Sequence, residues 1–339
     1  MGQQGLMVMT HIKEPQMRIE RLRGNPIIRP HMDARMGANI NGPSLIRVPD
    51  WVEHPLGTYY LYFADHKGHY IRLAYADRLE GPWQTYAPGT LQLDQSHFLT
   101  TPPEIPPELL PSLAKMEKQR AGMVGVETPI ENATAPHIAS PDAHVIDEYR
   151  EIRLYFHGLE GCRYQVSRVA RSKDGIHFQA APEILGQSYL RMFRYQGHYY
   201  GMAMPGVFYR SADGLTRFET GPTLFNPHMR HAGLLPRGDQ LYVFWSQVGD
   251  TPERILLSTI DLRPDWMTWQ ASAPVEVLRP EPAWEGSEEP LTPSIRGAIK
   301  VLVNQLRDPA VFAEDDRIFL LYTVAGESGI AIAEIFLDT

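Results

Sequence analysis

The sequence predicts an all-β fold, a five-bladed β-propeller formed by one chain of 339 residues. Three observations support it. Short apolar and aromatic runs alternate with 29 prolines and 27 glycines, while long amphipathic helical patterns are absent, which is typical of strands joined by turns. One order of strands and turns recurs five times, and a separate strand-like segment near the N-terminus can complete the last repeat.

The repeat consists of a polar residue, an apolar run, a turn, an aromatic-rich run and a third strand. The aromatic-rich runs are residues 59–63, 152–156, 198–202, 241–245 and 318–322. Third strands are expected at residues 70–75, 164–170, 206–210, 254–260 and 329–335. Because every repeat contains the parts of one four-stranded blade, we interpret residues 1–339 as a single propeller domain.

Closing turns with a terminal aromatic residue follow the third strands at residues 81–83, 172–178, 211–218 and 265–269. In the Ser-x-Asp-Gly…Phe turns, Asp and Gly meet separate backbone demands of a tight turn. The fifth repeat ends at Thr339 without such a turn or a fourth strand, whereas residues 18–22 resemble the connectors at 181–185 and 274–278. We therefore expect an N-terminal strand to complete blade five, which would close the ring and remove its exposed edges.

A Pro-rich insert at about 96–136 interrupts the repeats. Leu109, Leu110, Leu113, Met116 and Arg120 predict a short helix inside it. The insert is interpreted as a solvent-exposed excursion, with a lid or a subunit contact as the alternative, because long loops in compact domains are often functional.

Composition limits the possible partners. The chain is 43% hydrophobic and 21% charged, with a net charge of −8, which argues against nucleic acid because a phosphate-binding surface needs clustered Lys and Arg. Cys162 is the single cysteine, so an internal disulfide framework and a Cys-based zinc cluster are excluded. No apolar run is long enough to span a bilayer, and residues 1–10 lack a secretory signal. We expect a cytoplasmic protein with a small carbohydrate substrate and leave its oligomeric state open.

Asp308-Pro309 at a strand start, the Tyr-rich second strands and the Ser-x-Asp-Gly…Phe turns resemble the five-bladed propeller glycosidases. This superfamily includes arabinanases and xylosidases, invertases and levansucrases, and neoagarooligosaccharide hydrolases. The resemblance covers most of the chain and implies glycoside hydrolysis in a central funnel, although a fold does not fix a function. Many members carry an Asp base at the start of blade one and a Glu acid at the start of blade three. Here those positions read Asn41 and Tyr189, with Arg191 two residues on.

In a propeller blade the first strand starts, and the second strand ends, at the same face near the central axis. Aligning the first strands by their distance to the next aromatic run places Asp142, His231 and Asp308 at equivalent positions in blades two, four and five. His144 should point the same way as Asp142 because side chains alternate along a strand.

Loops between second and third strands should reach the same funnel. They contribute His66, His157, Glu253 and Glu327, together with Glu160. We interpret Glu160 and Glu253 as solvated loop charges. The long connector into blade five adds Glu285, and Arg230 and Arg307 directly precede His231 and Asp308.

These residue types suit a sugar, because aromatic faces stack on rings while acids and Arg bind hydroxyl groups. Glycoside hydrolysis needs a protonated acid and a second carboxylate. Asp308, beside Arg307, is expected to stay ionised as a base or stabiliser with Asp142 as its electrostatic partner, and Glu285 or Glu327 is expected to donate the proton. The expected substrate-binding residues are Asn41, His66, His144, His157, Arg191, Arg230, His231 and Arg307.

Alternatives remain for individual residues and for the whole protein. Asp142 and Asp308 can simply cap strand starts, and His144 and His231 can be satisfied core histidines or, as in neoagarooligosaccharide hydrolases, a catalytic acid. We expect no required cofactor, although a metal ion held by His144, His157 and His231 with Asp142 is an open option. The arginines at 191, 230 and 307 favour an anionic sugar. A non-catalytic carbohydrate-binding propeller and a metal-dependent or lyase-type propeller enzyme are the competing functions.

Overall fold

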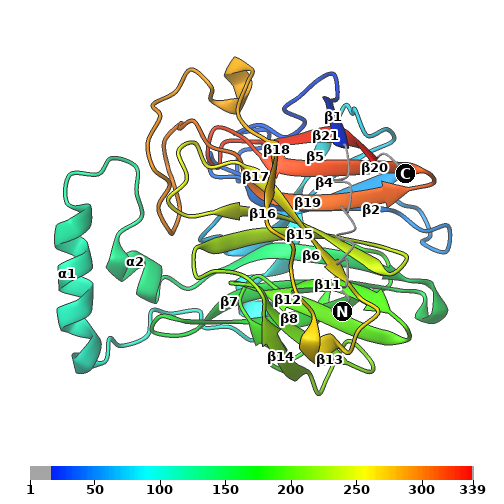
Figure 1. Cartoon of the computed structure of the whole chain (residues 1–339), viewed down its shortest axis with the longest axis horizontal. Helices are drawn as coiled ribbons and strands as arrows, with labels where there is room; N and C mark the ends of the chain where they lie inside the picture. The colour runs from blue at the N-terminus through cyan, green and yellow to red at the C-terminus, as the bar shows by residue number, and fades with distance from the viewer. Residues whose placement is uncertain (1–16, 338–339) are drawn as a thin grey trace, which may run out of the picture.

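Five antiparallel sheets form a ring, and the computed structural model describes residues 17–337 of the chain (Figure 1). The predicted five-bladed β-propeller is therefore confirmed. Residues 1–10, which entered the expectation about a secretory signal, lie outside the described residues.

Blades one to four each follow chain order from the axis outwards, and the outer edge of blade two is split between two short strands that both pair with β8. Blade one comprises β2 (Asn41–Arg47), β3 (Tyr59–Ala64), β4 (Tyr70–Ala76) and β5 (Gln84–Gln92). Blade two comprises β6 (Ile138–Ile146), β7 (Glu151–Gly161), β8 (Tyr164–Ser172), β9 (Gln179–Ala180) and β10 (Gly186–Gln187). Blade three comprises β11 (Arg191–Tyr195), β12 (His198–Ala203), β13 (Val207–Ser211) and β14 (Glu219–Thr223). Blade four comprises β15 (Met229–Arg237), β16 (Gln240–Gln247), β17 (Ile255–Asp261) and β18 (Val275–Leu278).

Blade five combines both ends of the chain. It comprises β19 (Arg307–Glu314), β20 (Arg317–Thr323), β21 (Ile330–Leu337) and β1 (Met17–Arg21). β1 pairs antiparallel with β21, with Met17 opposite Leu337 and Arg21 opposite Ala333. The N-terminal strand thus completes the last blade as predicted, and the pairing satisfies backbone groups that would otherwise form an exposed edge.

The aromatic second strands are buried on both faces, which explains their composition. In β3, Tyr60 and Tyr62 pack in a cluster with blade two, whereas Leu61 and Phe63 pack with blade five. Because successive side chains of a strand point to opposite faces, a strand between two neighbouring blades is apolar at every position.

One residue at the start of each first strand adopts a left-handed backbone conformation. These residues are Gly42, Ser140, Tyr189, His231 and Asp308, with φ between 48° and 64°. In blades one, two, four and five the strand register shifts at this point, as in a β-bulge. The sequence alignment that equated Asp142 with His231 and Asp308 is therefore wrong by two residues, because Ser140 occupies that position in blade two.

The first strands approach each other closely around the axis, and we expect Gly233→Ala to destabilise the protein by about 1–3 kcal/mol. A Cβ atom at Gly233 in β15 would lie 2.9 Å from the Cα atom of Ala310 in β19. Gly161→Ala is the matched control, because its Cβ atom would meet nothing closer than 3.7 Å. Urea unfolding of both variants measures the difference, and equal free energies of unfolding would contradict the close packing.

The insert forms α1 (Leu110–Arg120) and α2 (Pro129–Thr134) beside the ring (Figure 1). The helix predicted from Leu109 to Arg120 is confirmed. Arg120 donates to the carbonyl oxygens of Glu127 (2.9 Å) and Arg296 (2.8 Å), so the insert is tied to the connector that leads into blade five. Among the described helices, none is both long and apolar enough to cross a membrane.

Candidate functional site

Two cavities lie near the axis. The first, which we call the funnel, has a volume of about 360 Å³ and is reached at the end where the first strands begin. Its lining includes Asn41, His66, His157, Tyr189, Arg230, His231 and Asp308. The second, the lower channel, has a volume of about 570 Å³ and is lined by residues of all five first strands, including Asp142, His144 and Arg191. The predicted site residues are therefore divided between the two cavities, and Arg307, Glu285 and Glu327 line neither of them.

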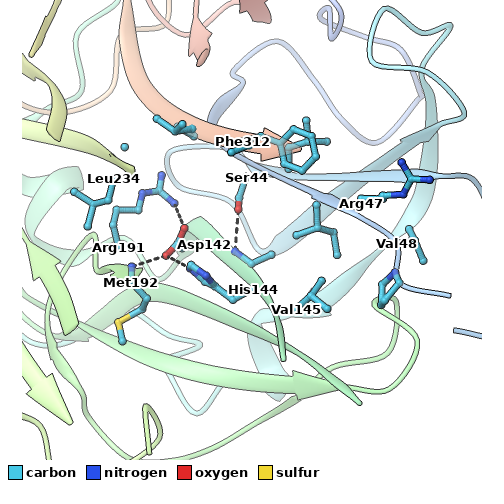
Figure 2. Close-up of a pocket in the computed structure, with 18 of the residues that line it drawn as sticks. Ser44, Arg47, Val48, Asp142, His144, Val145, Arg191, Met192, Leu234 and Phe312 are labelled. Atoms are coloured by element: carbon cyan, nitrogen blue, oxygen red, sulfur yellow. Dashed lines mark hydrogen bonds and ion pairs between the residues drawn. The ribbon is translucent and has the colours of Figure 1, made fainter. Parts of the chain in front are cut away.

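The lower channel contains a hydrogen-bonded acid–histidine pair (Figure 2). Asp142 Oδ2 accepts from His144 Nε2 (2.8 Å) and from the backbone N–H of Met192 (2.7 Å), and Arg191 Nη1 lies 3.7 Å from Oδ1. Burial opposes ionisation of Asp142, but His144 and Arg191 outweigh it and hold the pKa of this carboxyl below its usual value. His144 does share the side of Asp142, as predicted, but both line the lower channel.

A layer formed by Arg191 and Tyr189 separates the two cavities. Arg191 donates through Nε to Ala232 O (3.0 Å) and through Nη1 to Pro141 O, and its guanidinium carbon lies 4.6 Å from the centre of the Tyr189 ring. Tyr189 lines the funnel, whereas Arg191 lines the lower channel. The cation–π contact therefore links the lining of the funnel, through Tyr189, to the lining of the lower channel, through Arg191.

Asp308 lies at the floor of the funnel and is 1% exposed. Its Oδ1 accepts from the Tyr189 hydroxyl (2.8 Å), and its Oδ2 lies 3.4 Å from Thr323 Oγ1. Burial, reinforced by repulsion from Glu327, raises the pKa of Asp308 to about 6. Asp308 is therefore more readily protonated than an ordinary aspartate, and Arg307 does not keep it ionised by direct pairing as was expected. The Arg307 side chain binds Gln305 and Glu327 instead of Asp308.

His231 stands next to Asp308 as a neutral group. Its Nδ1 accepts from the backbone N–H of Asp308 (3.4 Å), which places the proton on Nε2, 3.7 Å from Asp308 Oδ1. Burial and the positive charges of Arg230 and Arg307 hold the pKa of His231 well below its ordinary value. A neutral imidazole beside Asp308 cannot stabilise the carboxylate as a full ion pair would, which agrees with the raised pKa of Asp308.

A buried ionic network adjoins the funnel and reaches its lining through Arg230. Arg230 donates to both carboxylate oxygens of Glu253, from Nε to Oε1 (2.8 Å) and from Nη2 to Oε2. Arg307 Nε lies 3.2 Å from Glu253 Oε2. Arg307 Nη1 also donates to Glu327 Oε1 (2.8 Å). Glu253 is 0% exposed, so its interpretation as a solvated loop charge is wrong. No local sequence signal distinguishes it, because its partners come from strands far along the chain.

Glu327 and His66 connect this network to the funnel. Glu327 Oε1 lies 3.4 Å from His66 Nδ1, and Oε2 accepts from Asn39 (2.6 Å). Burial disfavours the charge on Glu327, but His66, Arg307 and Asn39 outweigh it and lower its pKa to about 2. Such a carboxyl holds no proton at neutral pH, which contradicts its predicted use as a proton donor. His66 itself is partly accessible, with 21% of its side chain exposed.

Two further funnel residues carry buried polar atoms without partners among residues 17–337, namely Asn41 Oδ1 and His157 Nδ1. Burial, together with the charges of His66 and Lys67, lowers the pKa of His157 to about 3, so it is neutral. Both residues were predicted to bind substrate, and buried polar atoms that lack partners are common where a ligand supplies them.

Glu285 lies elsewhere. It belongs to a short 3-10 turn, Ala283–Glu285, and accepts from Arg21 Nε (2.7 Å) and the Tyr322 hydroxyl (2.8 Å). It lines neither the funnel nor the lower channel. Of the four predicted acids, Asp308 alone lines the funnel. Within residues 17–337, no group of three or more His, Cys, Asp or Glu is placed to hold a metal ion, and the proposed set is split because Asp142 and His144 lie in the lower channel.

No family model matches the chain. The uncharacterized protein R118 of Acanthamoeba polyphaga mimivirus is 36% identical over 323 residues, which cover 88% of this chain and 83% of that protein.

Among solved structures, a putative glycoside hydrolase from Parabacteroides distasonis is similar with a TM-score of 0.57 at 12% identity, covering 93% of this chain and 95% of the other. A protein described with the GH130 family of mannoside phosphorylases and hydrolases has a TM-score of 0.59 at 12% identity, covering 94% and 93%. A β-xylosidase/α-arabinofuranosidase from a compost microbial metagenome has a TM-score of 0.54 at 12% identity, covering 96% of both chains. The chain thus has the propeller fold found in glycoside hydrolases.

Proposed function

The chain belongs to the same family as the mimivirus protein, and we propose that it is a glycosidase that cleaves the bond to a small or terminal sugar in the funnel. One observation supports this proposal above the others. Asp308 lines the funnel, is buried, and has a pKa raised to about 6. A carboxyl group with such a pKa can hold a proton near neutral pH and deliver it to a glycosidic oxygen.

In the proposed reaction, protonated Asp308 donates its proton to the glycosidic oxygen as the bond to the anomeric carbon breaks. Water attacks that carbon and transfers a proton to His66, whose imidazolium is stabilised by Glu327 at 3.4 Å. His66 then loses the proton to solvent, and Asp308 regains one. Because Glu327 has a pKa of about 2, it remains the anionic partner of His66 throughout.

The other funnel residues have supporting roles in this proposal. Tyr189 fixes Asp308 through the 2.8 Å hydrogen bond, and Asn41 and His157 offer buried polar atoms to sugar hydroxyl groups. Asp142, His144 and Arg191 take no part in bond cleavage, because they line the lower channel.

The proposal is tested by incubating the protein with a panel of aryl glycosides and oligosaccharides and measuring product release. On any substrate that is cleaved, we expect His66→Gln to lower kcat by about 100-fold or more, because general base catalysis typically contributes that much. His198→Gln is the matched control, since His198 is exposed at the turn between β11 and β12 and lines neither the funnel nor the lower channel. Equal rates for wild type and His66→Gln would remove His66 from the mechanism.

A non-catalytic carbohydrate-binding propeller is the second candidate. The observation that favours it is the lack of a second carboxylate in the lining of the funnel as described, since most glycosidases use a pair. This candidate predicts saturable sugar binding with no product over many hours, whereas the glycosidase proposal requires turnover.

A further inference from the structure

The rim of the funnel carries an excess of positive charge. Its lining includes the arginines Arg163, Arg230 and Arg296, whereas Asp308 supplies the carboxylate. Arg230 is neutralised by Glu253. Within residues 17–337 the side chains of the two remaining arginines contact no carboxylate; Arg163 contacts Ser112 Oγ and Arg296 contacts Pro227 O. The funnel is therefore cationic, and more so when Asp308 is protonated.

Arg296 is held in place from two sides. Its carbonyl oxygen accepts from Arg120 of the insert (2.8 Å), and its Nη2 donates to Pro227 O (2.9 Å). Partial burial and repulsion from Arg230 lower the pKa of Arg296, while Glu253 acts against this. Both guanidinium groups line the funnel, and the repulsion between them is an unfavourable interaction that a bound anion would relieve.

Arg163 approaches from the β7–β8 turn. Its backbone has a φ of 58°, and its N–H donates to Ala133 O (2.8 Å), so the turn is fixed against the insert. Its Nη1 has only a long contact with Ser112 Oγ (3.5 Å). By contrast, Arg168 in the neighbouring strand has an acid partner, Glu160, at 2.8 Å. Arg163 thus leaves most of its five N–H donors available at the funnel rim.

From this arrangement we propose that Arg296 and Arg163 form an oxyanion subsite at the rim of the funnel, which takes a carboxylate or phosphate group. The ligand is either a sugar that carries this group or free phosphate bound beside a sugar. The inference rests on the proposed function in placing the sugar in the same funnel. It differs from the sequence-based interpretation, which favoured an anionic sugar because of Arg191, Arg230 and Arg307.

The side chains of those three arginines already have partners within the protein. Arg230 and Arg307 are paired with Glu253 and Glu327, and Arg191 contacts Asp142 and backbone oxygens. A planar guanidinium with free N–H groups binds carboxylate and phosphate in a two-point geometry. Arg163 and Arg296 have that capacity, and Asp308 lies deeper, where the neutral part of a sugar would reach it.

The subsite is tested by isothermal titration calorimetry in an Asp308→Asn background, so that binding is measured without turnover. The probes are glucuronate and galacturonate, their neutral counterparts glucose and galactose, and inorganic phosphate. We expect a uronate or phosphate to bind at least about tenfold more tightly than the neutral sugars, with affinity falling as salt rises. Arg296→Gln and Arg163→Gln should each weaken anion binding by about tenfold, and Arg296→Lys should restore part of it.

Arg237→Gln is the matched control, because Arg237 is exposed at the far end of β15. Tighter binding of a uronate than of phosphate assigns the anion to the sugar. Tighter binding of phosphate than of either uronate, weakened in Arg296→Gln, assigns it to free phosphate. The subsite is disproved if no anion binds better than the neutral sugars, or if Arg237→Gln weakens binding as much as Arg296→Gln. If the wild-type protein cleaves no glycoside but anions still bind through Arg296 and Arg163, the proposed reaction is refuted and the anion subsite is not.

Discussion

Replacing Asp308 with Asn should reduce turnover by about 10²–10⁴-fold, the range typical for loss of a general acid. The substitution removes the transferable proton but keeps an oxygen that can accept from the Tyr189 hydroxyl, which now lies 2.8 Å from Asp308 Oδ1. The fold should therefore survive. Steady-state kinetics on a cleaved substrate, with circular dichroism as the check on folding, measures the effect.

Asp142→Asn provides the control for this experiment. Asp142 lies in the lower channel, so the variant should retain turnover close to wild type. The opposite pattern, in which Asp142→Asn is inactive and Asp308→Asn is active, would place the chemistry in the lower channel and overturn the proposed mechanism.

The pH dependence follows from the same carboxyl group. If Asp308 must be protonated, kcat/KM should fall above pH 6, by about tenfold per pH unit, because its pKa is about 6. A profile that stays flat as the pH rises past that value would contradict a proton-donating role.

The raised pKa of Asp308 also affects stability. Its folded-state value of about 6 lies above the usual value of 3.8. The folded state therefore favours the protonated form, and this contribution is complete below the usual pKa and is lost as the pH rises through 6. Relative to wild type, Asp308→Asn should thus become more stable as the pH rises, with a total change of up to about 3 kcal/mol. Denaturant unfolding below the usual pKa and well above pH 6 measures this difference.

Much of the fold was predictable because each blade repeats the same local rules. The Ser-x-Asp-Gly turns form as expected, with Asp174 Oδ1 accepting from the backbone N–H groups of Ile176 and His177 (both 2.8 Å). The aromatic second strands were predictable because they are buried on both faces. The N-terminal strand was predictable because the fifth repeat would otherwise leave a sheet edge unfilled.

The position of Asp142 was mispredicted because distances were counted back from the second strand across loops of unequal length. Four residues separate the paired ends of β6 and β7, Ile146 and Glu151, whereas two residues separate Glu314 from Arg317 in blade five. A sequence signal for the correct alignment does exist. The left-handed residue is followed by proline in three blades, at Gly42-Pro43, Ser140-Pro141 and Asp308-Pro309. Aligning these dipeptides would have placed Ser140, not Asp142, with Asp308. The protonation behaviour of Asp308 had no such sequence signal. Its raised pKa depends on burial and on the nearby charge of Glu327, and both arise only in the folded chain.

The second large effect is expected at Glu253, the acid that sequence reasoning took for a solvated charge. Glu253→Gln should destabilise the protein by about 3–5 kcal/mol, because it leaves Arg230 and Arg307, both buried, with Glu327 as their remaining acid in this network. Urea unfolding gives the free energy directly.

The matched control is Glu219→Gln, which breaks the exposed pair with Arg210 (2.8 Å, with 64% of the Glu219 side chain exposed) and should cost less than about 1 kcal/mol. The contrast separates a buried network from a surface ion pair of similar length. Equal losses for both variants would mean that Arg230 and Arg307 are not held by Glu253. The floor of the funnel would then lack the rigid base on which His231 and Asp308 depend, because Arg230 and Arg307 directly precede them in the first strands.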